Sequence, residues 1–335
     1  MAERVVEAAV DEPRTGALVL AFAAIYLIWG STYLAIRFAI ETLPPFLMLF
    51  GRFFTAGLLM YAFLRFRGLP RPTPREWAGS AVVGALLLFG GTGAVAWSEQ
   101  WIPSGLAALI VAIVPVWMVL LDWVGPARHR PRPAVGFGLV LGLGGVAVLV
   151  GPVDLSGDGR MLLAGSVAVV FGTLSWAVGS VYGKHLPHPR SPWVAAATQM
   201  VTGGVLLAIA GTIAGEWSRV SLAAISVRSI LALAYLIVFG SLEAFGAYVY
   251  LLRHAAPARV GSYAYVNPVV AVFLGWALAD EPVTARTLLA AAIILTGVIL
   301  IVTKRRARKP AEPAHREPGP FDSKPDAPLP PCTAS

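Results

Sequence analysis

Two charged residues stand inside long apolar stretches of this 335-residue chain: Arg52 within Thr42–Leu64 and Glu243 within Ser229–Leu252. A charge in the middle of a bilayer costs about 2.5–3.5 kcal/mol on insertion scales, so each side chain should face a cavity or a partner. We predict that Glu243 binds a proton or a cationic group of a ligand, and that Arg52 is its counter-charge or holds a carboxylate. Structural alternatives stay open, because Arg52 can serve in an ion pair or as a backbone clamp and Glu243 can be a protonated, hydrogen-bonded buried acid.

Aromatic side chains form a second candidate site. Trp29, Tyr33 and Trp176 lie deep within apolar stretches, and Tyr263 lies near the start of another. Such rings can line a pocket for an apolar or cationic ligand, through burial of area and cation–π contact. Plain packing between helices is the equal alternative.

Pro115 and Pro268 interrupt two further apolar stretches. Proline removes a backbone donor and kinks a helix, which frees carbonyl groups that can face a cavity. We predict that both prolines act as hinges and that Asn267 hydrogen-bonds a ligand or the loosened backbone, with Ser262 and Tyr263 on the same helical face. A static kink that improves packing is the alternative.

Four further acidic residues lie at the ends of apolar stretches. We predict that Glu99, in a short turn, caps the helix that follows, since acidic residues favour helix N-termini. Attraction of cations is the alternative for this residue. We interpret Asp122, Asp280 and Glu281 as residues near the membrane–water interface.

The elements that must position these residues are apolar and long. Hydrophobic residues make up 57% of the chain and charged residues 13%, against about 25% charged in a soluble domain. So few charges exclude a soluble globular enzyme and a disordered protein, because they cannot coat a water-facing surface. A run of about 20 apolar residues spans a bilayer as a helix. The sequence contains ten such runs: Thr15–Ile36, Thr42–Leu64, Trp77–Ser98, Gln100–Leu121, Pro133–Val153, Met161–Gly183, Ser191–Gly215, Ser229–Leu252, Gly261–Ala279 and Thr287–Thr303.

The ten runs form two units of five. Trp29–Arg37 (WGSTYLAIR) aligns with Trp176–Lys184 (WAVGSVYGK) at a spacing of 147 residues. The alignment pairs further residues in order: Pro45 with Pro192, Arg52 with Gln199, Gly57 with Gly204, Phe89-Gly90 with Phe239-Gly240, and Pro115 with Pro268. Gln199, as the partner of Arg52, joins the candidate site. An odd number of crossings inserts the second unit from the opposite side of the membrane. The predicted fold class is therefore an all-α integral membrane protein with ten transmembrane helices in two inverted five-helix repeats.

Lys and Arg residues predict the orientation. Most of those outside the ten runs lie on the side of the N-terminus, which places both termini in the cytoplasm of a protein in the plasma membrane. We expect a cytoplasmic segment over residues 1–15, the first repeat over 16–153, the second over 160–303, and a disordered cytoplasmic tail over 304–335. Because the basic residues lie between apolar runs, the net charge of +8 does not indicate nucleic-acid binding.

Four motifs resemble those of one family: Ile28–Tyr33 (IWGSTY), Pro103–Val116 (PSGLAALIVAIVPV), Ser175–Gly183 (SWAVGSVYG) and Ser262–Glu281 (SYAYVNPVVAVFLGWALADE). From about Ala17 to Thr303 the chain resembles the EamA family of the drug/metabolite transporter superfamily, and closely its YedA-type branch. The resemblance implies a central cavity lined by helices one, three, four, six, eight and nine, and the export or exchange of small metabolites, amino acids or toxic compounds without ATP. It does not support a role for Glu243, since the family more often has an apolar or small residue there.

Motifs for other chemistry do not occur in the sequence. It has no G-x-x-x-x-G-K-[ST] loop and no H-E-x-x-H motif, so we predict no cofactor, no metal and no enzymatic activity. An inverted repeat is the usual architecture of alternating access, with the substrate near the membrane midplane. We therefore predict a secondary transporter, a monomer or homodimer in the lipid bilayer, that exports a small molecule, with protons as the candidate coupling ion. The alternatives are an uncoupled facilitator and a membrane enzyme or scaffold of the same fold.

Overall fold

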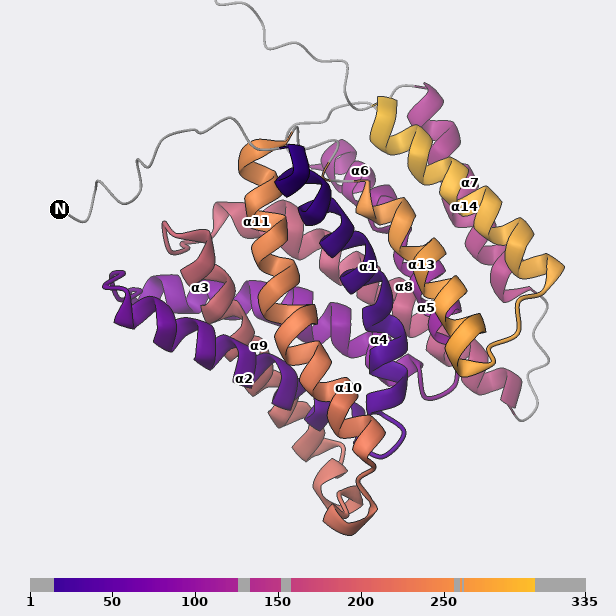
Figure 1. Cartoon of the computed structure of the whole chain (residues 1–335). Coiled ribbons are helices and arrows are strands. Elements are labelled where there is room, and N and C mark those ends of the chain that lie inside the picture. Colours follow the sequence, from indigo (N-terminus) through magenta and orange to yellow (C-terminus); the bar gives the residue numbers. More distant parts are fainter. Residues whose placement is uncertain (1–14, 126–132, 152–157, 256–259, 261, 305–335) are drawn as a thin grey trace, which may run out of the picture.

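The computed structural model describes residues 15–125, 133–151, 158–255, 260 and 262–304. The segments predicted over residues 1–15 and 304–335 fall almost wholly outside this part. The described residues form ten apolar helical segments (Figure 1), of which nine are long enough to cross a membrane and the tenth, Tyr263–Ala279, is shorter. In chain order the segments are α1 (Thr15–Ala39), α2 (Pro45–Phe66), α3–η2–α4 (Pro74–Gly84, Ala85–Thr92, Gly93–Ser98), α5–α6 (Ser104–Val111, Val114–Val124), α7 (Pro133–Val150), α8 (Asp158–Tyr182), α9 (Pro192–Ile213), α10–η6–α11 (Val227–Ile237, Val238–Glu243, Ala244–His254), α13 (Tyr263–Ala279) and α14 (Ala285–Lys304).

Prolines and caps define where several segments begin. Pro45 and Pro192, which the repeat aligns, each stand at the start of a helix, α2 and α9. Proline suits this position because its fixed φ is helical and no N–H is needed there. The third segment begins at Pro74, earlier than predicted, because Thr73 and Glu76 form a reciprocal capping box.

The helices make the same contacts twice, with exchanged partners. The aligned pairs α2 with α9 and α7 with α14 pack against each other, side by side in Figure 1. Helix α1 packs against α13 and against α10, η6 and α11; its repeat mate α8 packs against α5, α6, η2 and α4. Each half therefore offers the other the same surfaces, as two related modules would. The predicted fold class is confirmed.

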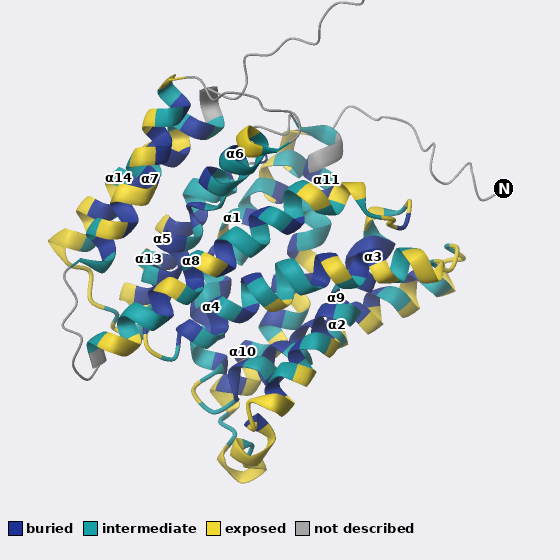
Figure 2. Ribbon diagram, turned by 180° about the vertical axis from the view of Figure 1, so that it is seen from behind, coloured by how far each residue is buried: buried dark blue, intermediate teal, exposed yellow. Residues whose placement is uncertain are grey.

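Apolar side chains cover much of the outer face of the bundle. Figure 2 shows exposed residues along the outward sides of the helices, and they include Leu20, Phe171 and Ile213, which are 72%, 66% and 82% exposed. Water would disfavour so much apolar surface, whereas lipid chains solvate it. This surface agrees with a chain that crosses a membrane many times.

Glycines allow the aligned helices to approach closely. A Cβ atom on Gly57 of α2 would lie 2.8 Å from the backbone N of Val201, and one on Gly204 of α9 would lie 2.9 Å from the backbone N of Phe54. In the same way, a Cβ on Gly138 of α7 would lie 2.8 Å from the carbonyl oxygen of Gly297 of α14, and a Cβ on Gly297 would lie 2.7 Å from that of Gly138. Small residues at such crossings let helix backbones pack without intervening side chains.

Two adjacent glycines of α7 give a matched test of this packing. A Cβ on Gly145 would meet the backbone N of Ile294 at 3.0 Å, whereas one on Gly144 meets nothing within 4 Å. We expect Gly145→Val to force α7 and α14 apart and to lower the free energy of unfolding by about 1–3 kcal/mol, the usual cost of overpacking. Gly144→Val should change it by less than about 0.5 kcal/mol, as expected for a surface substitution. Thermal unfolding in detergent measures both, and equal midpoints would contradict this interface.

Two segments contain a stretch of π-helix at aligned places. The stretches are Ala85–Thr92 and Val238–Glu243, and they hold the aligned pairs Phe89-Gly90 and Phe239-Gly240. Within them hydroxyl groups bond carbonyl oxygens five residues earlier: Thr92 to Leu87 at 3.5 Å and Ser241 to Leu236 at 3.0 Å. Single-turn π-helices often mark functional sites, because they leave backbone groups to be satisfied by other partners.

The two predicted hinge prolines behave differently. The fourth segment breaks between α5 and α6, and Pro115 stands in the first turn of α6. Pro268 lies inside α13, which continues through it from Tyr263 to Ala279. An interruption is thus present before Pro115, while Pro268 is accommodated within a helix. The predicted hinge motion stays a prediction for both.

Candidate functional site

Arg52 of α2 holds the π-helical stretch η6. Its side chain is 6% exposed, and its Nε donates to the hydroxyl oxygen of Ser241 at 3.1 Å. Its Nη2 donates to the carbonyl oxygen of Gly240 at 3.4 Å, and the guanidinium lies 4.7 Å from the ring centre of Phe53. Arginine suits this place because its planar fork can bond two acceptors at once. These contacts match the backbone-clamp alternative for Arg52.

Glu243 lies at the end of the same stretch but does not meet Arg52. Its side chain is exposed, and among the described residues it takes part in no hydrogen bond or ion pair. The physical reason is the helix turn: residues two positions apart, such as Ser241 and Glu243, do not share a helix face. The predicted Arg52–Glu243 charge pair is therefore absent from this arrangement, and a binding role for Glu243 stays a prediction.

Three aromatic rings from three helices meet around Trp29. The ring centres of Trp29 and Tyr248 of α11 are 5.3 Å apart, and those of Trp29 and Tyr263 of α13 are 5.2 Å apart at 78°. Edge-to-face contacts of this kind add to the stability of buried rings. Next to them the hydroxyl groups of Tyr26 and Ser262 lie 2.5 Å apart. Two of the predicted aromatic site residues, Trp29 and Tyr263, are thus brought together, and Tyr248 is a neighbour that the sequence had not indicated.

Trp176 belongs to a different place. Its indole packs on Gly91 of η2, with its Cε3 atom 2.9 Å from where a Cβ on that glycine would stand. Trp29 and Trp176 therefore have different neighbours, because each tryptophan lies beside the helices of the opposite repeat. Gln199 is half-buried on α9, and its backbone carbonyl oxygen approaches Gly84, the last residue of α3 before η2.

Asn267 and Tyr33 lie along the contact between α1 and its neighbours. Asn267 is 7% exposed, and its Oδ1 has no hydrogen-bond partner among the described residues. Its backbone oxygen closely approaches Gly30 of α1. Tyr33 packs against the apolar core around α5 to α8. A buried amide oxygen without a partner is uncommon and costs free energy, so Asn267 stays a candidate for ligand contact.

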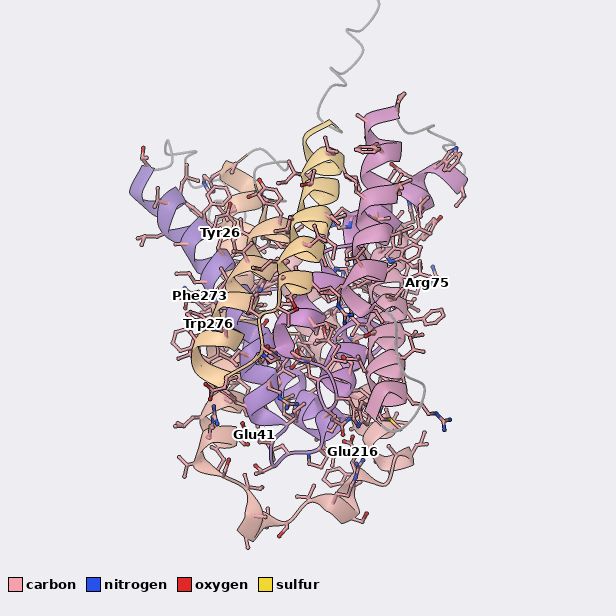
Figure 3. The ribbon with its side chains drawn as sticks, turned by 90° about the vertical axis from the view of Figure 1, so that its right-hand side faces the viewer. Tyr26, Glu41, Arg75, Glu216, Phe273 and Trp276 are labelled. Atoms are coloured by element: carbon pink, nitrogen blue, oxygen red, sulfur yellow. The ribbon has the colours of Figure 1, made fainter. Side chains whose placement is uncertain are left out.

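An open groove follows the outer side of this contact. Its volume is about 440 Å³, and the hydroxyl groups of Ser31 and Tyr235 bond each other across it at 2.7 Å. Figure 3 labels Phe273, one of its wall residues on α13, and Tyr26 on α1. None of the predicted site residues lines it; the lining residues are Leu27, Ser31, Tyr235, Val269, Val270, Phe273 and Leu274.

Two acids, one buried and one partly buried, cap helices that lie far away in the sequence. Glu216 is 1% exposed and accepts the backbone N–H groups of Phe46 and Leu47, at the start of α2. Glu281 accepts those of Ser104 at 2.7 Å and Gly105 at 3.0 Å, at the start of α5. A carboxylate at a helix N-terminus satisfies free donors and meets the positive end of the helix dipole.

Glu281, which the sequence predicts to lie near the membrane–water interface, is partly exposed and also caps α5, because the turn after α13 packs against Gly105. Glu99 was predicted to cap that same helix, which is wrong, since Glu281 occupies the position. The carboxylate of Glu99 is instead buried, with no hydrogen-bond partner in the described part of the chain. The sequence did not indicate that Glu99 is buried, because this residue stands outside the apolar runs.

These features define a class: a many-helix membrane protein whose two five-helix halves enclose buried aromatic, amide and charged groups. Comparison with known proteins identifies it further. The model of the EamA-like transporter family matches the chain twice, over residues 15–151 and 163–303, and the chain belongs to this family.

Named relatives agree with this assignment. The uncharacterized inner membrane transporter YedA of Escherichia coli (strain K12) is 41% identical over 295 residues, which cover 88% of this chain and 92% of that protein. The uncharacterized transporter YvbV of Bacillus subtilis (strain 168) is 30% identical, covering 88% and 94%. A solved crystal structure with 23% identity superposes with a TM-score of 0.59 over 88% of this chain and 99% of that one, which supports the fold. The protein is therefore a multi-pass membrane transporter of this family.

Proposed function

We propose that this chain is a secondary transporter that exports a small molecule by alternating access between its two halves. One observation carries the proposal: each half contacts the other through the same set of helices with partners exchanged. Two such modules can swap conformations, and the swap converts a cavity open on one side into a cavity open on the other. Family membership supports transport, and the absence of a nucleotide-binding loop in the sequence favours a secondary mechanism.

The halves of the proposed transporter are residues 16–153 and 160–303, flanked by cytoplasmic segments over 1–15 and 304–335. The two family matches, over residues 15–151 and 163–303, support this division. The excess of Lys and Arg on the side of the N-terminus supports cytoplasmic termini. The relative in Escherichia coli is named an inner membrane transporter, which supports a place in the plasma membrane.

The proposed substrate path follows the contact between α1 and α13 and its counterpart in the other repeat. The first wall holds Trp29, Tyr33, Tyr263 and Asn267, whose aromatic faces and free amide oxygen suit a small molecule with apolar and polar parts. The second wall holds Trp176 and Gln199 beside η2. Pro268 acts as a hinge on α13, which carries part of the first wall, and Pro115 acts as a hinge on α6, which packs against α8 of the second wall. Arg52, which bonds η6, and Glu243, the last residue of η6, are the charged groups of the path.

Flux into proteoliposomes tests the proposal. A screen of metabolites by thermal shift first finds a ligand, because any molecule that binds the folded state raises its apparent stability. We expect that ligand to cross proteoliposome membranes at least about tenfold faster than in protein-free vesicles, in line with a facilitated process rather than leak.

The pH gradient separates the alternatives. Flux that needs the gradient supports proton antiport, and flux that ignores it supports an uncoupled facilitator. A ligand that binds tightly yet never crosses would overturn transport in favour of a membrane enzyme or scaffold.

A further inference from the structure

Glu99 is a buried acid that the site described above does not use. It lies in the turn between α4, which ends at Ser98, and α5, which begins at Ser104. Its side chain is 0% exposed, and neither carboxylate oxygen has a hydrogen-bond partner among the described residues. The other buried acid, Glu216, holds two backbone N–H groups. Glu99 therefore lacks the contacts that would explain an ionised carboxylate in the interior.

The groups that face Glu99 come from three places. Arg37 of α1 donates to the backbone oxygen of Glu99, not to its carboxylate. Tyr33 lies one turn earlier on α1, and Glu281 approaches from the turn after α13. Helix α8 meets the turn through Gly165, which brings no charge. Glu281 already holds two backbone donors and adds negative charge to the site.

These surroundings favour a neutral carboxyl. Burial raises the pKa of Glu99 well above its usual range, the charge of Glu281 raises it further, and Arg37 opposes both. Taking an unpaired carboxylate out of water costs several kcal/mol, and protonation avoids that cost. Opening this turn to water removes the cost as well. The closed arrangement must therefore bind a proton at Glu99 more tightly than an open one.

The turn that holds Glu99 lies where several helices meet, so proton binding at Glu99 is coupled to whether these helices part. Arg37, in the last turn of α1, donates a hydrogen bond to this turn, and Glu41 follows Arg37 in the chain. Figure 3 shows Glu41 and Glu216 at one end of the bundle. The turn also joins two segments that contact α8, α1 and α13. Access to Glu99 requires these helices to part at this end. Its protonation state is thus tied to whether the end is closed.

We propose that Glu99 is a proton-binding site whose protonation stabilises the state closed at this end of the bundle and whose ionisation favours opening. The proposal deepens the proposed function, since it rests on alternating access and assigns the proton to Glu99 in place of the exposed Glu243. A sodium ion between Glu99, Glu281 and the buried, unpartnered hydroxyl of Ser104 is the rival occupant. The adjacent positive charge of Arg37 disfavours it.

The sign of the pH dependence follows from the raised pKa. The closed state holds the proton at low pH, so its extra stability is complete below the pKa of the open state. That stability is lost as pH rises through the higher pKa of the closed state. Opening should therefore become more frequent as pH increases.

A cysteine reporter tests the proposal without a substrate. Ser98 is 0% exposed beside Glu99, so Ser98→Cys, in a background with Cys332→Ser, reacts with an impermeant maleimide only when the turn opens. The measured quantity is the ratio of two labelling rates: the rate of Ser98→Cys with Glu99 present, divided by the rate of Ser98→Cys with Glu99→Gln. Taking this ratio removes the intrinsic pH dependence of the thiol. We expect the ratio to exceed one already at about pH 5.5, above the usual pKa of a glutamate open to water, and to be about tenfold or more higher at about pH 8.5, since it rises tenfold for each pH unit between the pKa values of the open and closed states.

Controls keep the outcome specific. Glu41→Gln removes a carboxylate at the same end that pairs with Arg228 at 3.2 Å on the surface, and it should leave the pH profile unchanged. If Glu99→Gln does not fold, the exposed reporter Ser218→Cys supplies the reference rate instead. A ratio that stays constant with pH would overturn the proposal. So would a profile flattened by Glu243→Gln, or labelling slowed by sodium at constant pH.

The outcomes also separate this proposal from the transport function. Labelling needs no flux, so a pH-dependent ratio without any transported ligand would overturn alternating-access export and keep the proton site. Flux with a pH-independent ratio would overturn the proton site and keep the transporter.

Discussion

Replacing Glu281 with alanine is expected to cause one of the two largest effects among single substitutions. The change leaves the backbone N–H groups of Ser104 and Gly105 without their acceptor at the buried start of α5. Hydrogen bonds to charged groups contribute about 1.5–3 kcal/mol each, and loss of a helix cap costs about 0.5–2 kcal/mol. We expect Glu281→Ala to lower the free energy of unfolding by about 2–3 kcal/mol, measured by thermal or denaturant unfolding in detergent.

Two neighbouring substitutions separate capping from a general effect of charge. Glu281→Gln keeps one acceptor oxygen and should lose about half as much stability. Asp280 is exposed and has a positive φ of 52°, a conformation that asparagine tolerates well. Asp280→Asn removes one negative charge at the next position and should be neutral. If Asp280→Asn and Glu281→Ala lowered the midpoint equally, the cap would not be the cause.

The ten spans and their pairing could be predicted from the sequence. The thickness of the bilayer sets the length of each run, and a backbone in lipid must bond to itself, so long apolar runs become helices. The alignment pairs Gly57 with Gly204, and both glycines lie where α2 and α9 touch. Periodicity and length were enough because these features are local or repeated.

The π-helical stretches could not be predicted in the same way. A π-helical stretch leaves backbone carbonyl groups that partners from distant helices must bond. One such partner is Ser175 of α8, whose hydroxyl donates to the carbonyl oxygen of Leu86 at 2.7 Å. No local pattern shows which helix will supply such a group. The same limit explains why Pro115 accompanies a break and Pro268 does not, although the repeat aligns them.

The charged residues show most clearly that a sequence is insufficient to predict which side chains are buried. Hydropathy gave weight to Glu243 because it interrupts an apolar run, but hydropathy does not show burial, and the Glu243 side chain is exposed. Glu99 and Glu281 stand in turns, which a sequence reading assigns to water. Glu99 is buried and Glu281 is partly buried because turns of separate segments pack against each other at the end of the bundle.

Arg52 should have the largest effect on transport with the smallest effect on stability. Arg52→Met replaces a buried cation with an apolar side chain of similar length, which removes the cost of keeping a charge out of water and offsets the lost hydrogen bonds. The carbonyl of Gly240 and the hydroxyl of Ser241 would then lose the clamp that joins α2 to η6. We expect flux to fall by about 10–100-fold, equivalent to about 1.4–2.7 kcal/mol, while the unfolding midpoint stays within the range of a neutral substitution.

Two further arginine variants decide whether the clamp itself matters. Arg52→Lys keeps the charge but cannot bond two separated acceptors through a planar fork, so it should recover only part of the flux. Arg67 at the end of α2 is exposed and stacks on Phe63 at 5.3 Å, so Arg67→Met removes a comparable side chain from the same helix and should leave flux unchanged. If Arg52→Met lost stability in proportion to flux, Arg52 would only hold the fold together. A stable protein with little flux would instead place the joint between α2 and η6 within the motion that opens and closes the path.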